Sequence, residues 1–299
     1  MRKPIFLFLI TLSIYTFGQN NIKSLKKLEG IWIAEDFYNS FEKTLSAIDS
    51  KDAFHHSFPV ALRLNTSELN KKKLNIGYSS LHDHLLRPEV SRYTIYEKDT
   101  VYEQGYFEVN FSTKDSAGYV KTSAIYSFTN DWISYIKFNL DDTTISLYRP
   151  KNEKNEEQII KYLRISNSFE KDYHFPNPLY FYTRDKVLKG NYILKDSTGN
   201  ILSDSFIINS RGTISGYEKF EKFTAYYSTD IYCGPQPIAN TIMFYENILD
   251  QSAKGFGYAI KREINGNIKL YKTKWTVDKD GRDIPALAEL HYELIKQKD

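Results

Sequence analysis

Arg262 is the charged residue whose neighbours say most about the chemistry of this chain. It follows Tyr258 and Ile260 at alternate positions and precedes Ile264, and the residues between them are mostly charged or small. Alternate residues of a strand share one face, so this spacing predicts a guanidinium on an otherwise apolar surface. If that surface is an interior, the charge needs a partner, because an unpaired buried charge costs several kcal/mol.

Three kinds of partner would satisfy Arg262. A neighbouring acid is the first, with Asp278 and Glu246 as candidates, and solvent at a strand end is the second. The third is a ligand carboxylate or phosphate held through a bidentate contact. Arg63 differs, because it alternates with apolar residues that should take the inner face, and we expect it to face solvent.

The histidines form a second candidate for chemistry. His82 and His84 have the spacing that puts two imidazoles on one strand face, and His55-His56 precedes them, which would suit zinc. However, residues 79–89 resemble a loop, and no cysteine pair supports the site, so solvated loop histidines are the preferred interpretation. Motifs of nucleophilic hydrolases, phosphate loops and zinc proteases are missing from the sequence. We predict no catalytic residue, no metal and no cofactor; a metal-assisted hydrolase is the enzymatic alternative.

The N-terminus predicts export. Arg2 and Lys3 precede an apolar run over Ile5–Tyr15, which is too short to span a bilayer comfortably. We predict a signal peptide at residues 1–18, cleavage before Gln19, a periplasmic or extracellular location, and no stable membrane insertion afterwards. An uncleaved N-terminal anchor is the alternative.

Charge and cysteine content exclude two other classes of protein. The chain has 40 Lys and Arg against 37 Asp and Glu, so it lacks the basic excess of a nucleic-acid binder. Cys233 is the only cysteine, so no intrachain disulfide can form and stability must come from core packing. A buried apolar side chain is the preferred interpretation of Cys233, ahead of a nucleophile.

Short alternating segments predict a nearly all-β protein. The 24 Tyr and 19 Phe favour half-buried strand surfaces. Two sets of segments, of about nine and eight strands, begin at Leu28–Tyr38 and Leu188–Asp196, and no long helices alternate with them, which favours antiparallel meanders. Asn265-Gly266 is a strong hairpin signal. A short helix is expected at Ser40–Asp49, between the first two strands.

The two sets predict two β-barrel domains. We place the N-terminal domain at residues 19–166, a partly packed linker at 167–186 and the C-terminal domain at 187–299. The linker interpretation rests on its prolines and on a break in the strand rhythm. The two halves share their strand spacing but few identical residues, so an internal duplication is a hypothesis.

The start of the first set resembles the lipocalin and fatty-acid-binding protein superfamily. The resemblance rests on Leu28-x-Gly30-x-Trp32, an early helix and about eight antiparallel strands. In that family the Gly-x-Trp closes one end of the barrel and an early loop or helix covers the other. The second half departs from the motif, with Gly190 and Tyr192. The resemblance implies two lipocalin-like meander barrels, at least one of which holds a small apolar or amphipathic ligand.

The leading functional hypothesis is an exported, non-enzymatic protein that binds a small hydrophobic or amphipathic molecule, anionic if Arg262 contacts it. Trp32, Tyr126, Tyr258 and Arg262 are the predicted ligand-binding residues. The alternative is a structural or protein-interaction module whose barrels are filled by Tyr and Phe. An interior void of several hundred Å³ would distinguish the first class from the second. The ligand and the oligomeric state are open.

Overall fold

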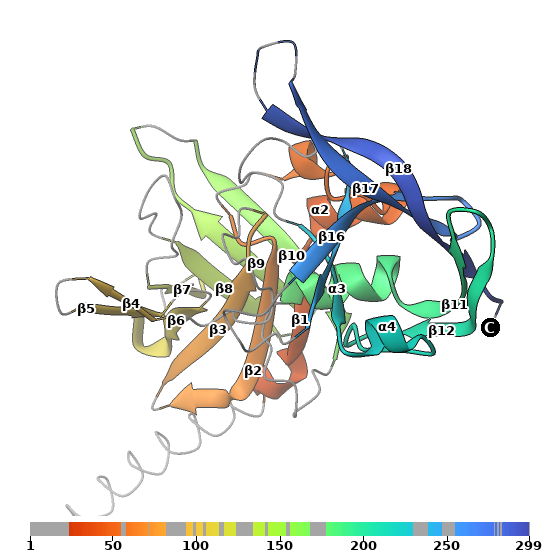
Figure 1. Cartoon of the computed structure of the whole chain (residues 1–299). Coiled ribbons are helices and arrows are strands. Elements are labelled where there is room, and N and C mark those ends of the chain that lie inside the picture. The colour runs from red at the N-terminus through yellow and green to blue at the C-terminus, as the bar shows by residue number, and fades with distance from the viewer. Residues whose placement is uncertain are drawn as a thin grey trace, which may run out of the picture. The chain divides into compact units, whose positions relative to one another are not determined.

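Antiparallel strands dominate the computed structural model of the chain (Figure 1). They form two eight-stranded sheets and one two-stranded sheet, and one large sheet curls into a half-barrel. The all-β, antiparallel prediction is therefore confirmed. The structure describes residues 24–54, 58–70, 72–81, 94–97, 100–103, 106–113, 117–123, 134–140, 143–153, 156–167, 178–229, 239–246, 255–277, 279, 281 and 283–298.

The first sheet is a meander in which the first strand pairs with the last. Its order is β6-β3-β2-β1-β10-β9-β8-β7, so strands that follow one another in the chain lie side by side. The two end strands also meet, through a bridge between Val109 and Thr122 and a 2.8 Å hydrogen bond from Ser123 N to Glu108 O. The strands are β1 (Gly30–Ala34), β2 (Ala61–Asn70), β3 (Lys73–Ser79), β6 (Tyr106–Asn110), β7 (Tyr119–Lys121), β8 (Tyr135–Asn139), β9 (Thr144–Arg149) and β10 (Gln158–Ser166).

The second sheet repeats this topology. Its order is β13-β12-β11-β18-β17-β16-β15-β14, again with the first strand beside the last. A bridge between Thr213 and Thr224 and a 2.8 Å hydrogen bond from Ala225 N to Gly212 O join its end strands. The strands are β11 (Gly190–Asp196), β12 (Ile201–Ile208), β13 (Ile214–Ser215), β14 (Thr224–Tyr227), β15 (Thr241–Tyr245), β16 (Gly255–Arg262), β17 (Ile268–Val277) and β18 (Asp283–Lys296).

A helix does lie between the first two large-sheet strands, but it begins earlier than predicted. α2 spans Glu35–Thr44, so the predicted strand through Tyr38 ends at Ala34 instead. Phe37 and Phe41 are one helical turn apart, fully buried and stacked at 5.4 Å, and this pair fixes the helix. The helix ends where Leu45 takes a φ of 50° and donates to Phe41 O at 2.7 Å.

A second helix, α3 (Pro178–Val187), occupies the end of the predicted linker. Proline suits the first helical position because its missing N–H would have no partner there. Tyr182 is buried and donates to Glu42 Oε1 at 2.7 Å, and Lys186 Nζ lies 2.8 Å from the same oxygen. These contacts fasten α3 to α2. Residues 168–177 lie outside the described part of the chain.

The remaining elements are short. They are η1 (Lys26–Leu28), η2 (Lys51–Ala53), η3 (Phe111–Thr113) and α4 (Glu218–Glu221), together with the two-stranded sheet of β4 (Thr94–Glu97) and β5 (Thr100–Glu103). The sequence pattern of residues 92–98 predicts a strand, and β4 falls inside that range, whereas the pattern predicts no strand at β5.

The chain divides into two compact units that interleave in sequence. The first comprises the described parts of residues 1–35, 62–77 and 106–173, and the second those of 36–61, 78–105 and 174–299. The first sheet thus belongs mainly to one unit and the second to the other, while α2 packs with the second sheet's unit. The domain boundaries drawn from the sequence remain a prediction.

Candidate functional site

Arg262 lies on the inner face of the second sheet. It pairs with Ile268 of β17, which pairs with Leu294 of β18, which in turn pairs with Leu194 of β11. Residues directly opposite in antiparallel strands share a face. The three partners are almost fully buried, so the guanidinium is carried by the core-facing side of the sheet, at the point where β16 ends.

The turn after Arg262 is a three-residue loop that ends in a left-handed glycine. Gly266 N donates to Glu263 O at 3.0 Å, Glu263 N donates to Asn267 O at 2.8 Å, and Gly266 has a φ of 89°. The hairpin predicted at Asn265-Gly266 is confirmed. Ile264, expected to continue the inner face, stands instead on this loop and is fully exposed at 107%. The alternation fails there because the strand has already ended.

A shallow pocket of about 420 Å³ opens beside this turn. Its volume lies within the range of small-ligand sites. Three cations contribute to its wall: Arg262 from β16, Lys296 from the end of β18 and Lys298 beyond it. Among the described residues that line it, none is acidic; the others are Ile264, Asn265, Gly266 and Gln297.

Gly266 allows two of these cations to approach the same turn. A Cβ placed on Gly266 would lie 2.8 Å from Lys296 Cδ and 3.8 Å from Arg262 Nη2. The space that a larger residue would fill is therefore bordered by both side chains. Lys296 also lies directly opposite Tyr192 of β11.

One donor of Arg262 has no hydrogen-bond partner among the described residues. This donor is Nε, which is buried and accepted by no group in the described part of the chain. Glu246, one predicted partner, pairs with Lys222 at 2.8 Å instead, and Asp278, the other, lies outside the described residues. The acid next in sequence, Glu263, is held by Lys269 at 2.7 Å, which lowers the pKa of its carboxyl.

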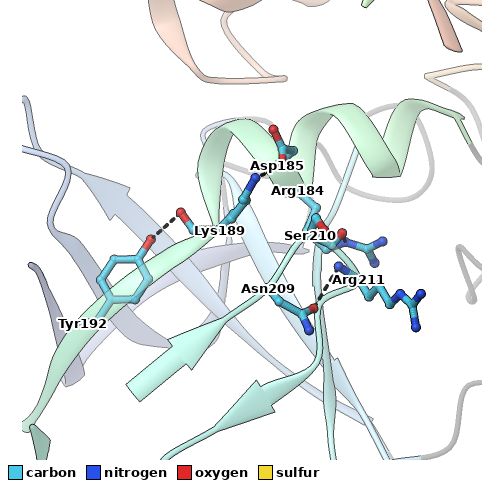
Figure 2. Close-up of polar contacts among 7 residues, drawn as sticks. All are labelled: Arg184, Asp185, Lys189, Tyr192, Asn209, Ser210 and Arg211. Carbon is cyan, nitrogen blue, oxygen red and sulfur yellow. Dashed lines mark hydrogen bonds and ion pairs between the residues drawn. The ribbon is translucent and has the colours of Figure 1, made fainter. Parts of the chain in front are cut away.

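The positive charge of Arg262 acts on the hydroxyl of Tyr192, near the start of β11. Burial raises the pKa of the Tyr192 hydroxyl to about 12, and the positive charge of Arg262 opposes that rise. The hydroxyl donates to Leu188 O at 2.9 Å and lies 3.5 Å from Lys189 O. Figure 2 shows the contact of Tyr192 with Lys189 next to the Lys189–Asp185 ion pair (2.9 Å) at the end of α3.

A second arginine near this helix has a structural role. Arg184 of α3 is almost fully buried and donates from Nε to Ser210 O at 2.8 Å (Figure 2). Its guanidinium lies 5.5 Å from the centre of the Tyr226 ring. Asn209 Oδ1 accepts from Arg211 N at 2.9 Å and shapes the turn that presents Ser210. Arg184 therefore links α3 to the β12–β13 turn.

Trp32 is a core residue of the first unit. Its side chain is 0% exposed, and its indole N–H donates to Leu28 O at 2.9 Å. The Arg164 guanidinium lies 5.6 Å from the ring centre and also donates to Lys27 O. Tyr126, also predicted to bind ligand, lies outside the described residues.

Tyr258 belongs to an aromatic cluster on the inner face of the second sheet. Its ring stacks on His291 at 5.4 Å, and burial raises the pKa of its hydroxyl to about 12. Phe220 of α4 enters the same cluster, 5.0 Å from Phe244 and 5.5 Å from Tyr292. Aromatic side chains thus occupy this part of the inner face, and Ile260 separates Tyr258 from Arg262 along β16.

Sequence reasoning missed two features of the described residues. Lys296 and Lys298 were not singled out, although Lys296 alternates with the buried Tyr292 and Leu294. Arg149 was missed as well: it follows Ile145 and Leu147 on the inner face of β9, is 1% exposed, and donates from Nε to Ser134 Oγ at 3.0 Å.

Arg63 was expected to face solvent, and this is wrong. It is 9% exposed, and its neighbours in β2 are buried on both faces of the strand. Alternation separates an inner from an outer face only where the outer face meets water, and here other parts of the structure cover both.

The described residues hold no cluster of three or more His, Cys, Asp or Glu side chains suited to a metal ion. His55, His56, His82 and His84 lie outside that part of the chain, so the prediction about them stays open. Within the described residues, no helix has the length and apolarity needed to cross a bilayer. No known family model matches the chain, and a search of curated proteins finds no matching sequence.

Proposed function

We propose that this is an exported binding protein whose second sheet presents a site for a small anionic or amphipathic molecule, with Arg262 as the anchoring residue. The observation that carries the proposal is the partly buried guanidinium at the pocket of about 420 Å³, with a buried Nε that the described residues leave unsatisfied. A ligand carboxylate or phosphate would accept charge-assisted hydrogen bonds from this guanidinium. Such bonds are roughly twice as strong as hydrogen bonds between neutral groups.

The pocket also offers an apolar contact. Ile264 stands fully exposed on the loop that forms one wall, next to the three cations. Folding gains nothing from an exposed β-branched side chain on a turn, whereas a ligand with an apolar portion would cover it. This arrangement favours an amphipathic molecule with its charged group at Arg262.

A comparison within the chain supports a role for Arg262 beyond folding. In the first sheet, Ala34 lies two residues after Trp32 and pairs with Tyr162 of β10. Tyr162 pairs with Ile145 of β9, which pairs with Phe138 of β8. In the second sheet, Leu194 lies two residues after Tyr192, and the same pairings lead through Leu294 and Ile268 to Arg262 of β16. A meander of this topology therefore accepts an aromatic residue where the second sheet carries a cation.

We further propose that each sheet closes into a lipocalin-like barrel. Support comes from the pairing of first with last strand in both sheets and from the single bridges that join their end strands. Eight strands enclose an interior just wide enough for side chains or one small ligand. The aromatic cluster around Phe220 favours side chains in the second barrel, which puts its ligand at the end of the sheet.

Isothermal titration with laurate tests the site, with the uncharged dodecanol as the comparison ligand. We expect Arg262→Ala to weaken laurate binding by about tenfold or more, because a hydrogen bond to a charged group contributes about 1.5–3 kcal/mol. Arg211→Ala, an exposed arginine of the same unit, removes the same net charge and should leave affinity unchanged. Equal loss in both variants, or none in Arg262→Ala, would refute the anchoring role.

The second candidate function is a protein-interaction module with a filled interior. The packing of Phe220 against Phe206, Phe244 and Tyr292 favours it, because these rings occupy space that a ligand would need. Absence of laurate binding, together with capture of a specific protein partner through an exposed face, would support this candidate.

A further inference from the structure

Hydrogen bonds to neighbouring elements hold the C-terminal segment that lines the pocket at Arg262. Lys296 N donates to Asn267 Oδ1 at 3.0 Å, which joins the end of β18 to the turn after Arg262. Gln297 N donates to Asn191 O at 2.9 Å, and its side chain donates to Asp204 O at 2.8 Å. Lys296 and Gln297 are therefore anchored to the β16–β17 turn, to β11 and to β12. A preformed site loses little entropy when it binds.

The charge of this pocket exceeds what one carboxylate would neutralise. Arg262, Lys296 and Lys298 bring three positive charges to its wall, and none of the described lining residues is acidic. The nearby carboxylates of Glu263 and Glu293 both face Lys269, at 2.7 and 3.8 Å. Like charges gathered in a small volume repel one another, so the bound state gains most from a ligand with more than one negative charge.

We infer that the pocket binds a dianionic group, a phosphate monoester, shared between the Arg262 fork and the ammonium groups of Lys296 and Lys298. This inference rests on the proposed function. A phosphate offers three terminal oxygens, so it can accept a bidentate pair from the guanidinium and still face two ammonium groups. A carboxylate has only two oxygens, and a bidentate contact with the guanidinium uses both of them. The phosphate can belong to a soluble molecule or to a lipid headgroup, and both present the same chemistry to these three side chains.

Calorimetry with phenyl phosphate and benzoate at pH 8 tests the inference on the intact protein. We expect phenyl phosphate to bind about tenfold or more tightly than benzoate, because it carries roughly twice the charge at the same size. Lys296→Gln and Lys298→Gln should each reduce this preference while changing benzoate affinity little. Lys274→Gln, an exposed lysine on β17 that does not line the pocket, is the matched control and should change neither.

Lowering the pH to 5 adds a proton to the phosphate, whose second pKa is about 6, and should remove most of its advantage. Inorganic sulfate remains dianionic over this range and serves as the reference ligand. The hydrogen bond with Lys269 holds the pKa of the neighbouring Glu263 carboxyl below its ordinary value. A phosphate affinity that falls while that of sulfate holds supports the dianion; a parallel change in both overturns it.

Vesicle sedimentation separates the two sources of the phosphate. Binding to phosphatidic acid vesicles but not to phosphatidylcholine vesicles, reduced by Ile264→Ser, would assign a lipid headgroup, and binding of phenyl phosphate alone would assign a soluble monoester. Equal affinity for benzoate and phenyl phosphate, both lost in Arg262→Ala, would overturn the dianion and leave the proposed anion site intact. Failure of every anion to bind would refute both.

Discussion

The indole N–H of Trp32 donates a 2.9 Å hydrogen bond to the carbonyl of Leu28, four residues earlier in the chain. The second sheet contains the same relationship, in which the Tyr192 hydroxyl donates to Leu188 O, also at 2.9 Å and four residues earlier. Each aromatic residue lies on the first strand of its sheet and faces a basic residue of the last strand. Two sheets with little sequence in common thus start in the same way, which supports an internal duplication.

Removing either donor should destabilise the corresponding unit. Trp32→Phe leaves the Leu28 carbonyl buried without its partner, and we expect a cost of about 1–3 kcal/mol in urea unfolding. Tyr192→Phe should have a similar effect through Leu188. Trp275→Phe is the control, because this tryptophan is 67% exposed and should change the unfolding free energy by less than about 0.5 kcal/mol. Equal effects at Trp32 and Trp275 would contradict the role of the hydrogen bond.

Two glycines with the same backbone geometry should respond differently to alanine. Gly266 and Gly199 have φ values of 89° and 90°, so each substitution should cost about 1–2 kcal/mol through the left-handed conformation. A Cβ at Gly199 meets nothing within 4 Å, whereas one at Gly266 lies 2.8 Å from Lys296 Cδ. Only Gly266→Ala should therefore displace Lys296 and weaken anion binding, as calorimetry would measure. Unchanged anion affinity in Gly266→Ala would show that Lys296 does not depend on this space.

The aromatic cluster of the second sheet should be sensitive to loss of its central ring. Phe220 is 2% exposed and contacts Phe206, Phe244, Phe256 and Tyr292 at centroid distances of 5.0–6.0 Å. Phe220→Ala should cost about 3–5 kcal/mol in unfolding free energy, the usual penalty for emptying such a core site. Leu287→Ala, at an exposed position, should cost far less. A small effect at Phe220 would mean that its ring contributes little to the packing of this cluster.

Local patterns made much of the fold predictable from the sequence. The alternation of Ile145 and Leu147 with polar residues predicts a strand at residues 144–149, and β9 is found there with both side chains buried. The start of α2 was misplaced because Phe37 fits a strand continuing from Ile33 as well as a helix, whereas Phe41 already lay in the predicted helix. Only the packing of the two rings against each other decides between them, and that packing depends on the tertiary structure.

The candidate site was predictable only in part. Alternation along one strand was enough to place Arg262 on the inner face. The contribution of Lys296 depends on the pairing of β18 with β11, which joins distant parts of the chain, and on a turn that brings Gly266 beneath its side chain. Periodicity within a segment carries no information on such pairings, so the sequence could not assemble the three cations.

The turn after β11 should impose a pH dependence at the acidic end of the scale. Hydrogen bonds from the side chains of Thr198 and Asn200 lower the pKa of Asp196 from its ordinary value to about 2. Because the folded pKa is depressed, the stabilisation is complete above about pH 4, where the carboxyl of an unfolded chain is ionised, and is lost as the pH falls towards 2. A carboxyl NMR titration should show the low midpoint. In Asp196→Asn the folding stability should vary less with pH across this window; a midpoint near 4 in the parent protein would contradict the role of these hydrogen bonds.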